Sequence, residues 1–223
     1  PRVADIIRKL RPSMRQHRAR LAGKDIQTIF SEYYEKNEWQ NEESRSGHGS
    51  TLKATTSLRQ QLPVVLRDLN ARSLLDIPCG DFNWMKATPL ELELYLGGDI
   101  VQTLIEDLTR KYSAPTRRFM RLNLVTDRLP PADVLFCRDC FIHLTNADVL
   151  KALDNVRRSQ FRYVFISNYP LLRHNSDVWT GAVRFYNLSL PPFALPQPIK
   201  QLNDPGEGSF EYRCISIWEH KQW

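Results

Sequence analysis

The chain has 223 residues, of which 42% are hydrophobic and 10% aromatic, so one globular domain with additions can bury its own core. It contains no run of eighteen apolar residues and no secretory signal segment, and we expect a cytoplasmic protein without a transmembrane segment. Residues 1–24 contribute +7 to the net charge of +6, which leaves the rest of the protein almost neutral.

The basic segment is predicted to begin with a short amphipathic helix, because Val3, Ile6, Ile7 and Leu10 recur at helical spacing. Such a helix can contact RNA, an anionic lipid surface or a phosphorylated substrate. It can also pack on the domain or on a second copy of the chain in a homodimer. We favour packing.

A second helix is predicted over residues 25–45, and a polar loop follows at 44–51. The aromatic-rich face of this helix, which Trp39 follows in the sequence, consists of Ile26, Ile29, Phe30, Tyr33 and Tyr34. Residues 1–50 are therefore predicted to form an N-terminal helical extension with a covering loop, and residues 51–223 the main domain. A further helix is expected from about Thr51 to Leu69, with a break or kink at Pro63.

From Ser73 onward, strand and helix patterns alternate along the chain. The predicted strands are 73–77, 93–98, 118–124, 132–138 and 162–167, and the predicted helices are 83–87, 101–112 and 146–159. This alternation predicts an α/β fold with a Rossmann-like parallel sheet and helices on both faces. Residues 211–219 alternate well and predict a final, antiparallel strand.

The regular alternation stops between residues 168 and 209, a segment that holds six of the fourteen prolines. A long segment without periodicity inside a compact domain is usually a lid or a binding segment. Its aromatic and polar side chains suit a sugar face or a planar ring, and a solvated loop is the alternative. The predicted substrate-binding cluster consists of His174, Asn175, Asp177, Trp179 and Arg184.

Two neighbouring strands each end in an acid. The first ends at Asp76 and continues into a tight turn that contains Gly80; the second ends at Asp99, nineteen residues after Gly80. In a parallel sheet, backbone N–H groups and a helix N-terminus at such a turn face a crevice. An acid at this distance can accept from both hydroxyls of a ribose. The pair predicts a site for a nucleotide-like cofactor.

These motifs resemble the class I S-adenosylmethionine-dependent methyltransferase superfamily over about residues 50–168 and the last strand. The resemblance is carried by Leu75–Gly80, Gly98–Ile100, Asn123–Leu124 and Phe136–Leu144. More closely, the chain is similar to small bacterial methyltransferases with an S-G-x-G-S loop before a D-I-P-C-G-D-F-N-W-M turn, here Ser46–Ser50 and Asp76–Met85. It departs from the superfamily at Pro78 and Phe82, where glycines are usual, and at Asn123, where an acid is common.

The resemblance implies S-adenosylmethionine as the cofactor. Asp76 would anchor the turn or reach the methionine ammonium group, and Gly80 would let the backbone approach. Asp99 would accept from the ribose hydroxyls. Either acid can instead be a helix cap. The full predicted cofactor set is Trp39, Asp76, Pro78, Gly80, Asp81, Trp84, Asp99, Ile100, Asn123, Leu124 and Arg138. Tyr33, Tyr34 and Trp39, with the loop at 46–50, are expected to close over the cofactor.

Catalytic groups are expected at the end of the fourth strand. Asp139 and His143 lie there, four residues apart and on one face if the segment is helical. We predict His143 as the base for a hydroxyl acceptor and Asp139 as the residue that orients the base or the substrate. A structural role for His143 is the alternative.

The sequence offers no metal-binding pattern, and Cys137-x-x-Cys140 is interpreted as buried thiols rather than a redox pair. The resemblance therefore predicts an enzyme that O-methylates a small-molecule or glycan hydroxyl. Two alternatives remain open. One is a nucleic-acid methyltransferase that uses the basic N-terminal helix, and the other is a non-catalytic partner subunit with a methyltransferase fold.

Overall fold

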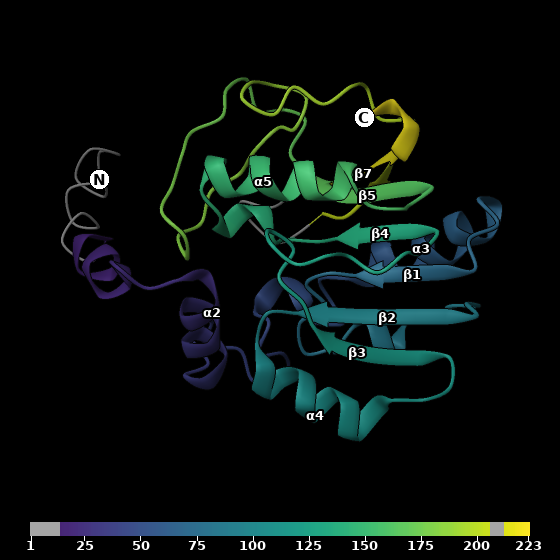
Figure 1. The fold of residues 1–223 in the computed structure, drawn as a ribbon, viewed down its shortest axis with the longest axis horizontal. Helices are drawn as coiled ribbons and strands as arrows, with labels where there is room; N and C mark the ends of the chain where they lie inside the picture. The colour runs from purple at the N-terminus through teal and green to yellow at the C-terminus, as the bar shows by residue number, and fades with distance from the viewer. Residues whose placement is uncertain (1–13, 206–211) are drawn as a thin grey trace.

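The computed structural model describes residues 14–205 and 212–223 (Figure 1). The amphipathic helix predicted from Val3 to Leu10 lies outside these residues. Residues 14–21 are helical, and the helix α2 (Ile26–Glu35) follows them. Residues 14–21 and Ile26–Glu35 of the extension are therefore helical, whereas residues 36–47 form turns and a loop.

The centre of the molecule is a seven-stranded sheet in the order β3-β2-β1-β4-β5-β7-β6. Its strands are β1 (Ser73–Asp76), β2 (Leu94–Asp99), β3 (Arg117–Arg121), β4 (Val134–Cys137), β5 (Tyr163–Asn168), β6 (Lys200–Asn203) and β7 (Cys214–Glu219). Neighbouring strands from β3 to β5 pair in parallel, whereas β7 runs antiparallel to both β5 and β6. The Rossmann-like sheet with an antiparallel final strand is confirmed.

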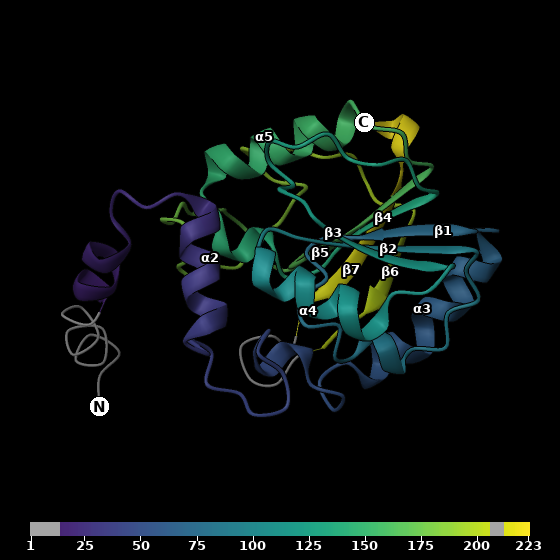
Figure 2. The same ribbon diagram turned by 60° about the horizontal axis from the view of Figure 1, so that its bottom comes forward.

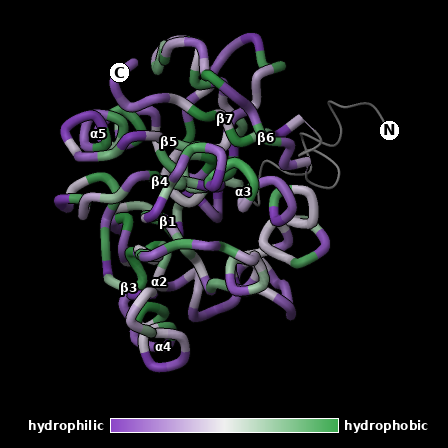
Figure 3. The backbone as a smooth tube through the Cα atoms, turned by 90° about the vertical axis from the view of Figure 1, so that its right-hand side faces the viewer, coloured by the Kyte–Doolittle hydropathy of each residue, from purple (hydrophilic) through white to green (hydrophobic). Residues whose placement is uncertain are grey.

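Alternating residues of the strands point to two separate cores. Leu75 of β1 packs in one cluster with the buried face of α5 (Asn146–Arg157). Leu74 packs in the other with α3 (Thr56–Asp68) and α4 (Gln102–Tyr112). Figure 2 shows α5 on one side of the sheet and α3 and α4 on the other, and in Figure 3 α5 and α3 flank the stacked strands. Because both faces are covered, the central strands β1, β4 and β5 are buried almost throughout.

Three predicted helices differ from the structure in their extent. The helix expected at 25–45 ends at Glu35, where the chain soon enters the left-handed region at Asn37 (φ 47°). The α-helix α3 continues through Pro63 without interruption. The helix expected at 83–87 is only a 3-10 turn, Met85–Ala87, because Phe82 adopts a positive φ of 60° and turns the chain. The β1 turn therefore lacks the helix N-terminus that the sequence suggested.

The strand β6 was not predicted, and it lies inside the segment expected to be irregular. Of its four residues only Leu202 is buried, so the sequence carries no alternating apolar signal. Pairing with β7, the next strand in the chain, defines β6: Asn203 pairs with Cys214. The position of β6 is a tertiary effect.

Two adjacent glycines of β2 allow the packing on its two faces to be compared. A Cβ at Gly97 would lie 2.6 Å from Cδ1 of Phe119, whereas a Cβ at Gly98 would lie 3.2 Å from Cδ2 of Leu122. Phe119 packs edge-on against Phe82 and Tyr95, so its ring cannot move freely.

We expect Gly97→Ala to lower the free energy of unfolding by about 1–3 kcal/mol and Gly98→Ala to lower it by less. Urea unfolding of both variants measures the difference. A Gly97→Ala protein as stable as the wild type would contradict this packing.

Candidate functional site

A cavity of about 310 Å³ lies where the parallel strands end. Figure 1 shows α2 crossing the same side, beyond the carboxyl ends of β1 to β4. The sequence-predicted residues that line the cavity are Trp39, Asp76, Pro78, Gly80, Asp81, Trp84, Asp99, Ile100, Asn123, Leu124, Arg138, Asp139 and His143. The fold thus gathers both predicted catalytic residues and every predicted cofactor residue around one space.

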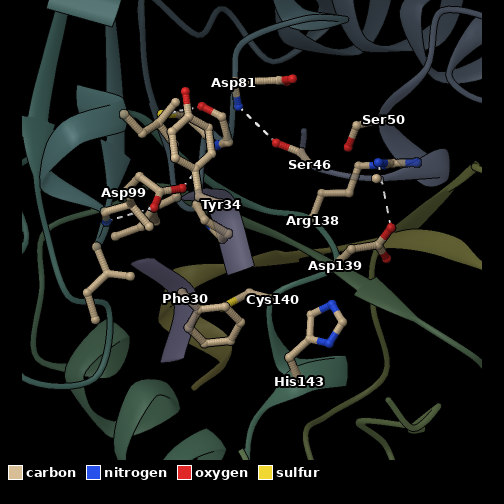
Figure 4. Close-up of a pocket in the computed structure, with 18 of the residues that line it drawn as sticks. Phe30, Tyr34, Ser46, Ser50, Asp81, Asp99, Arg138, Asp139, Cys140 and His143 are labelled. Atoms are coloured by element: carbon tan, nitrogen blue, oxygen red, sulfur yellow. Dashed lines mark hydrogen bonds and ion pairs between the residues drawn. The ribbon is translucent and has the colours of Figure 1, made fainter. Parts of the chain in front are cut away.

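The turn after β1 is fastened to the polar loop. The carboxylate of Asp81 accepts from the Ser44 hydroxyl at 3.0 Å and from the Arg45 backbone N–H at 2.8 Å, and the Ser46 hydroxyl accepts from the Asp81 N–H at 2.9 Å. Gly80 has a φ of 52°, and a Cβ there would lie 2.3 Å from Oγ of Ser46. Glycine is required for both reasons. Asp81 therefore holds the loop against the cavity (Figure 4).

Asp99 lies at one end of the cavity, which we call the ribose end and define by Asp99, Ile100 and Tyr34. Its two carboxylate oxygens accept from the backbone N–H groups of Val101 at 3.0 Å and Gly80 at 3.2 Å. Burial raises the pKa of this carboxyl to about 6, although these backbone donors lower it. A carboxylate has about four acceptor positions, so two remain for a ligand.

Asp76 is buried, with 2% of its surface exposed, and borders the same cavity. The Tyr95 hydroxyl donates to its Oδ2 at 2.6 Å. Burial raises the pKa of Asp76 to about 7; the Tyr95 hydrogen bond lowers it and the nearby Asp99 raises it further. Two acids with raised pKa values thus border one cavity.

The helix α2 has two different inward faces. Ile26, Phe30 and Tyr34, spaced four residues apart, line the cavity. Ile29 and Tyr33 instead form a small separate core with Leu21. The expected closure by this helix therefore involves Tyr34 but not Tyr33.

Asn123 reaches the cavity, but its side chain also shapes the turn after β3. Its Oδ1 accepts from the Val125 N–H at 2.9 Å, and its own N–H donates to Asp127 at 3.0 Å. The amide nitrogen is the part of the side chain that remains to donate to a ligand. Leu124 beside it is buried.

Arg138 and Asp139 belong to a buried charge network. Arg138 donates to Asp204 at 2.8 Å and 3.1 Å and to the Gly49 carbonyl at 2.9 Å. Arg213 donates to Asp139 and, at 3.1 Å, to Asp204. Burial lowers the pKa of Arg138, but the carboxylates of Asp204 and Asp139 raise it by more, so the pKa is raised overall. The guanidinium of Arg138 is thus committed to holding the loop at 48–50.

His143 occupies the opposite end, which we call the base end and define by His143, Phe30, Trp39 and Val183. Its Nδ1 lies 3.0 Å from the Ala182 carbonyl, so this carbonyl, rather than Asp139, orients the imidazole. The surrounding chain shields the ring from water and lowers its pKa, although the Ala182 carbonyl raises it. A neutral ring whose Nδ1 donates keeps its lone pair on Nε2.

The expected geometry of Asp139 is also corrected. Asp139 has a φ of 54°, so it lies outside any helix, and only Phe141–His143 forms a 3-10 turn. Its N–H donates to the Ser167 hydroxyl at 2.9 Å, while its carboxylate receives Arg213. Asp139 lines the cavity as a member of an ion pair.

None of the five residues of the predicted substrate-binding cluster lines the cavity. Asp177 instead accepts from the backbone N–H of Asn146 at 2.8 Å. Asn175 clamps a turn by donating to the Asn187, Leu190 and Pro191 carbonyls. Arg184 is buried over the rings of Tyr186 and Phe193. Trp179 packs near His17, and His174 is exposed. From this segment Val183, which sequence reasoning missed, reaches the cavity.

Within residues 14–205 and 212–223, no group of three or more His, Cys, Asp or Glu side chains is arranged to hold a metal ion. None of the helices in this part of the chain is long and apolar enough to cross a membrane.

No protein-family model and no curated protein matches the sequence. Solved structures do match the fold. Magnesium protoporphyrin IX methyltransferase (ChlM) from Synechocystis PCC 6803, with bound SAH, gives a TM-score of 0.60 at 16% identity, over 86% of this chain and 98% of that chain. N-methyltransferase NodS from Bradyrhizobium japonicum WM9, also with SAH, gives 0.60 at 12% identity, over 84% and 97%. PigF with SAH gives 0.63 at 15% identity, over 95% and 68%.

This chain has the class I S-adenosylmethionine-dependent methyltransferase fold. The closer likeness to small bacterial methyltransferases stays a prediction.

Within this methyltransferase fold, sequence reasoning missed the residues that reach the cavity from a distance. Asp204 and Arg213 bond to the end of β4 across 66 and 74 residues, and no local pattern indicates such pairing. Ile26 and Phe30 were assigned to an apolar face, but not to the cavity. Their spacing of four from Tyr34 is a signal that could have placed the three together.

The raised pKa of Asp76 predicts a pH-dependent gain from its replacement. As pH rises from about 4 to 7, the folded protein must surrender a proton that the unfolded chain has already lost, so stability falls. Asp76→Asn cannot ionise, and its Oδ1 can still accept from Tyr95. We expect the variant to be more stable than the wild type by about 1–4 kcal/mol at pH 8, with little difference near pH 4.

Thermal unfolding across this pH range measures the difference. Asp133→Asn is the control, because burial raises the pKa of Asp133 but hydrogen bonds, the Arg72 N–H foremost, lower it overall. Its effect should be constant above pH 5. A pH-independent effect of Asp76→Asn would contradict the raised pKa.

Proposed function

We propose that this protein is an S-adenosylmethionine-dependent methyltransferase that methylates a hydroxyl group of a small molecule or glycan. The observation that carries the proposal is a single cavity with Asp99 at one end and a neutral His143 at the other. One end suits a ribose, and the other suits an acceptor that must lose a proton.

The ribose end fits an adenosine group. Each oxygen of Asp99 accepts one backbone N–H, which leaves acceptor positions for the two hydroxyls of a ribose. Ile100, Leu104 and Leu124 supply apolar contacts beside it that suit an adenine ring. Asp99 would hold the ribose, and these three side chains would hold the base.

The buried acids also fit a cationic cofactor. S-adenosylmethionine carries a sulfonium and an ammonium group, and no phosphate. Burial makes the ionisation of Asp76 and Asp99 unfavourable in the free protein, and a nearby cation would favour their ionised forms. When bound, the sulfonium would supply an electrophilic methyl group, and Asp76 would hold the ammonium group.

His143 favours a hydroxyl acceptor over an amine. A hydroxyl needs a base that is unprotonated at neutral pH, whereas a neutral amine needs none. The lowered pKa of His143 keeps the imidazole neutral, and the Ala182 carbonyl leaves Nε2 as the acceptor atom. His143 would therefore accept the hydroxyl proton.

The ion pairs of the basic segment support a small acceptor rather than a nucleic acid. Arg20 donates to Glu38, and Lys24 donates to Glu32, both on or next to α2. Arg18 lies over the Trp179 ring. These contacts hold residues 18–24 against the protein and reduce the charge available to a phosphate backbone.

Cofactor binding tests the proposal directly. We expect S-adenosylhomocysteine to bind one-to-one with micromolar affinity in a calorimetric titration. Asp99→Asn keeps the size of the side chain but loses its charge, so we expect at least ten-fold weaker binding, as for a lost hydrogen bond to a charged group. Circular dichroism verifies that the variant is folded.

Asp107→Asn is the matched control, because Asp107 is a half-exposed α4 residue that does not line the cavity. It should bind like the wild type. A folded wild type that binds neither S-adenosylmethionine nor S-adenosylhomocysteine would reject the enzyme proposal and favour a non-catalytic subunit.

A further inference from the structure

Arg138 and Asp139, the charged side chains that line the cavity beside the base end, are both paired. Arg138 pairs with Asp204, and Arg213 pairs with Asp139 and Asp204. Two cations and two anions thus form one network. A carboxylate or phosphate of an acceptor would compete with Asp204 for Arg138. An ammonium group would compete with Arg213 for Asp139. Each competing ion would have to break a buried pair.

The remaining surface of the base end is aromatic and aliphatic. The ring centroid of His143 lies 6.1 Å from that of Phe30 and 5.7 Å from that of Trp39. Figure 4 shows Phe30 and His143 next to each other, away from Asp99 and Asp81. Val183 is 55% exposed and lines the cavity, so an apolar side chain stands where the cavity meets solvent.

We infer that the acceptor is an uncharged aromatic hydroxyl compound, a phenol, that enters past Val183 and presents its oxygen to Nε2 of His143. This inference rests on the proposed function and narrows its acceptor. Flat rings pack well edge-on or offset against Phe30 and Trp39. A sugar would bury several hydroxyls against these apolar walls without partners, which is unfavourable for each.

The base end contains a group, His143, that can accept the proton that such an acceptor loses. The phenol oxygen bonds to the methyl carbon as the carbon–sulfur bond breaks, and the electron pair of that bond remains on sulfur. The phenol proton moves to Nε2 of His143. The products are a methyl ether, S-adenosylhomocysteine with a neutral thioether sulfur, and an imidazolium that afterwards returns its proton to water.

The test compares probes of one shape on the protein saturated with S-adenosylhomocysteine, which cannot donate a methyl group. The probes are 2-naphthol, 2-naphthoate, 2-naphthyl phosphate and 2-naphthylmethylammonium, with methyl glucoside for sugars. We expect 2-naphthol to bind at least ten-fold more tightly than any other probe at pH 7, followed by calorimetry or tryptophan fluorescence. A charged probe or the sugar binding as tightly would overturn the inference, as would absence of 2-naphthol binding at millimolar concentration.

Val183→Glu locates the binding site, because it adds a charge at the entrance of the base end. We expect it to weaken 2-naphthol binding at least ten-fold and to leave S-adenosylhomocysteine binding unchanged. Val64→Glu is the control: Val64 is 44% exposed on α3 and does not line the cavity. Equal 2-naphthol binding by the two variants would overturn the placement. Loss of S-adenosylhomocysteine binding by the wild type would instead reject the proposed function.

Discussion

The site depends on one buried ion network at the carboxyl end of β4. Arg138, Asp139, Asp204 and Arg213 come from segments 66 and 74 residues apart, and the side chains of Asp204 and Arg213 are wholly buried. Removing one member of such a network leaves an uncompensated charge, which costs about 3–5 kcal/mol. The end of β4, the residues before β7 and the Gly49 carbonyl therefore have to assemble together, and this assembly forms one wall of the cavity.

The segment between β5 and β6 positions His143 through its backbone. The Gly181 N–H donates to the His143 carbonyl at 2.8 Å, and the Ala182 carbonyl receives Nδ1 of His143 at 3.0 Å. Tyr33 of α2 in turn donates to the Gly181 carbonyl at 2.9 Å. A proline-rich segment without periodicity can hold a side chain in this way because each of its residues still offers a carbonyl. The segment between β5 and β6 and the helix α2 thus set the orientation of the imidazole, although neither is close to His143 in the sequence.

The sequence was sufficient to predict the features of the site that depend on local residue patterns. Asp76 and Asp99 end buried strands, so their shared edge of the sheet follows from the parallel topology alone. His143 was placed at the cavity for the same reason, whereas its partner was not, because a backbone carbonyl leaves no trace in the residue type. The strand β6 and the pairing of Asp139 with Arg213 also escaped prediction. Asp139 and Arg213 are 74 residues apart, and the single buried side chain of β6, Leu202, gives no period to detect.

The fold alone does not explain why acids occupy the buried positions of Asp76 and Asp99. A polar or apolar side chain of similar size could fill the position of Asp76 without the loss of stability that accompanies its ionisation. Carboxyl groups with strongly shifted pKa values cluster at binding and catalytic sites, where a bound ligand can favour their ionised form. Here Asp76 and Asp99 face one cavity, and the cations that Arg138 and Arg213 provide are paired with Asp139 and Asp204. A charge that favours the ionised forms of Asp76 and Asp99 can come from a bound ligand, and the cationic cofactor proposed above would supply it.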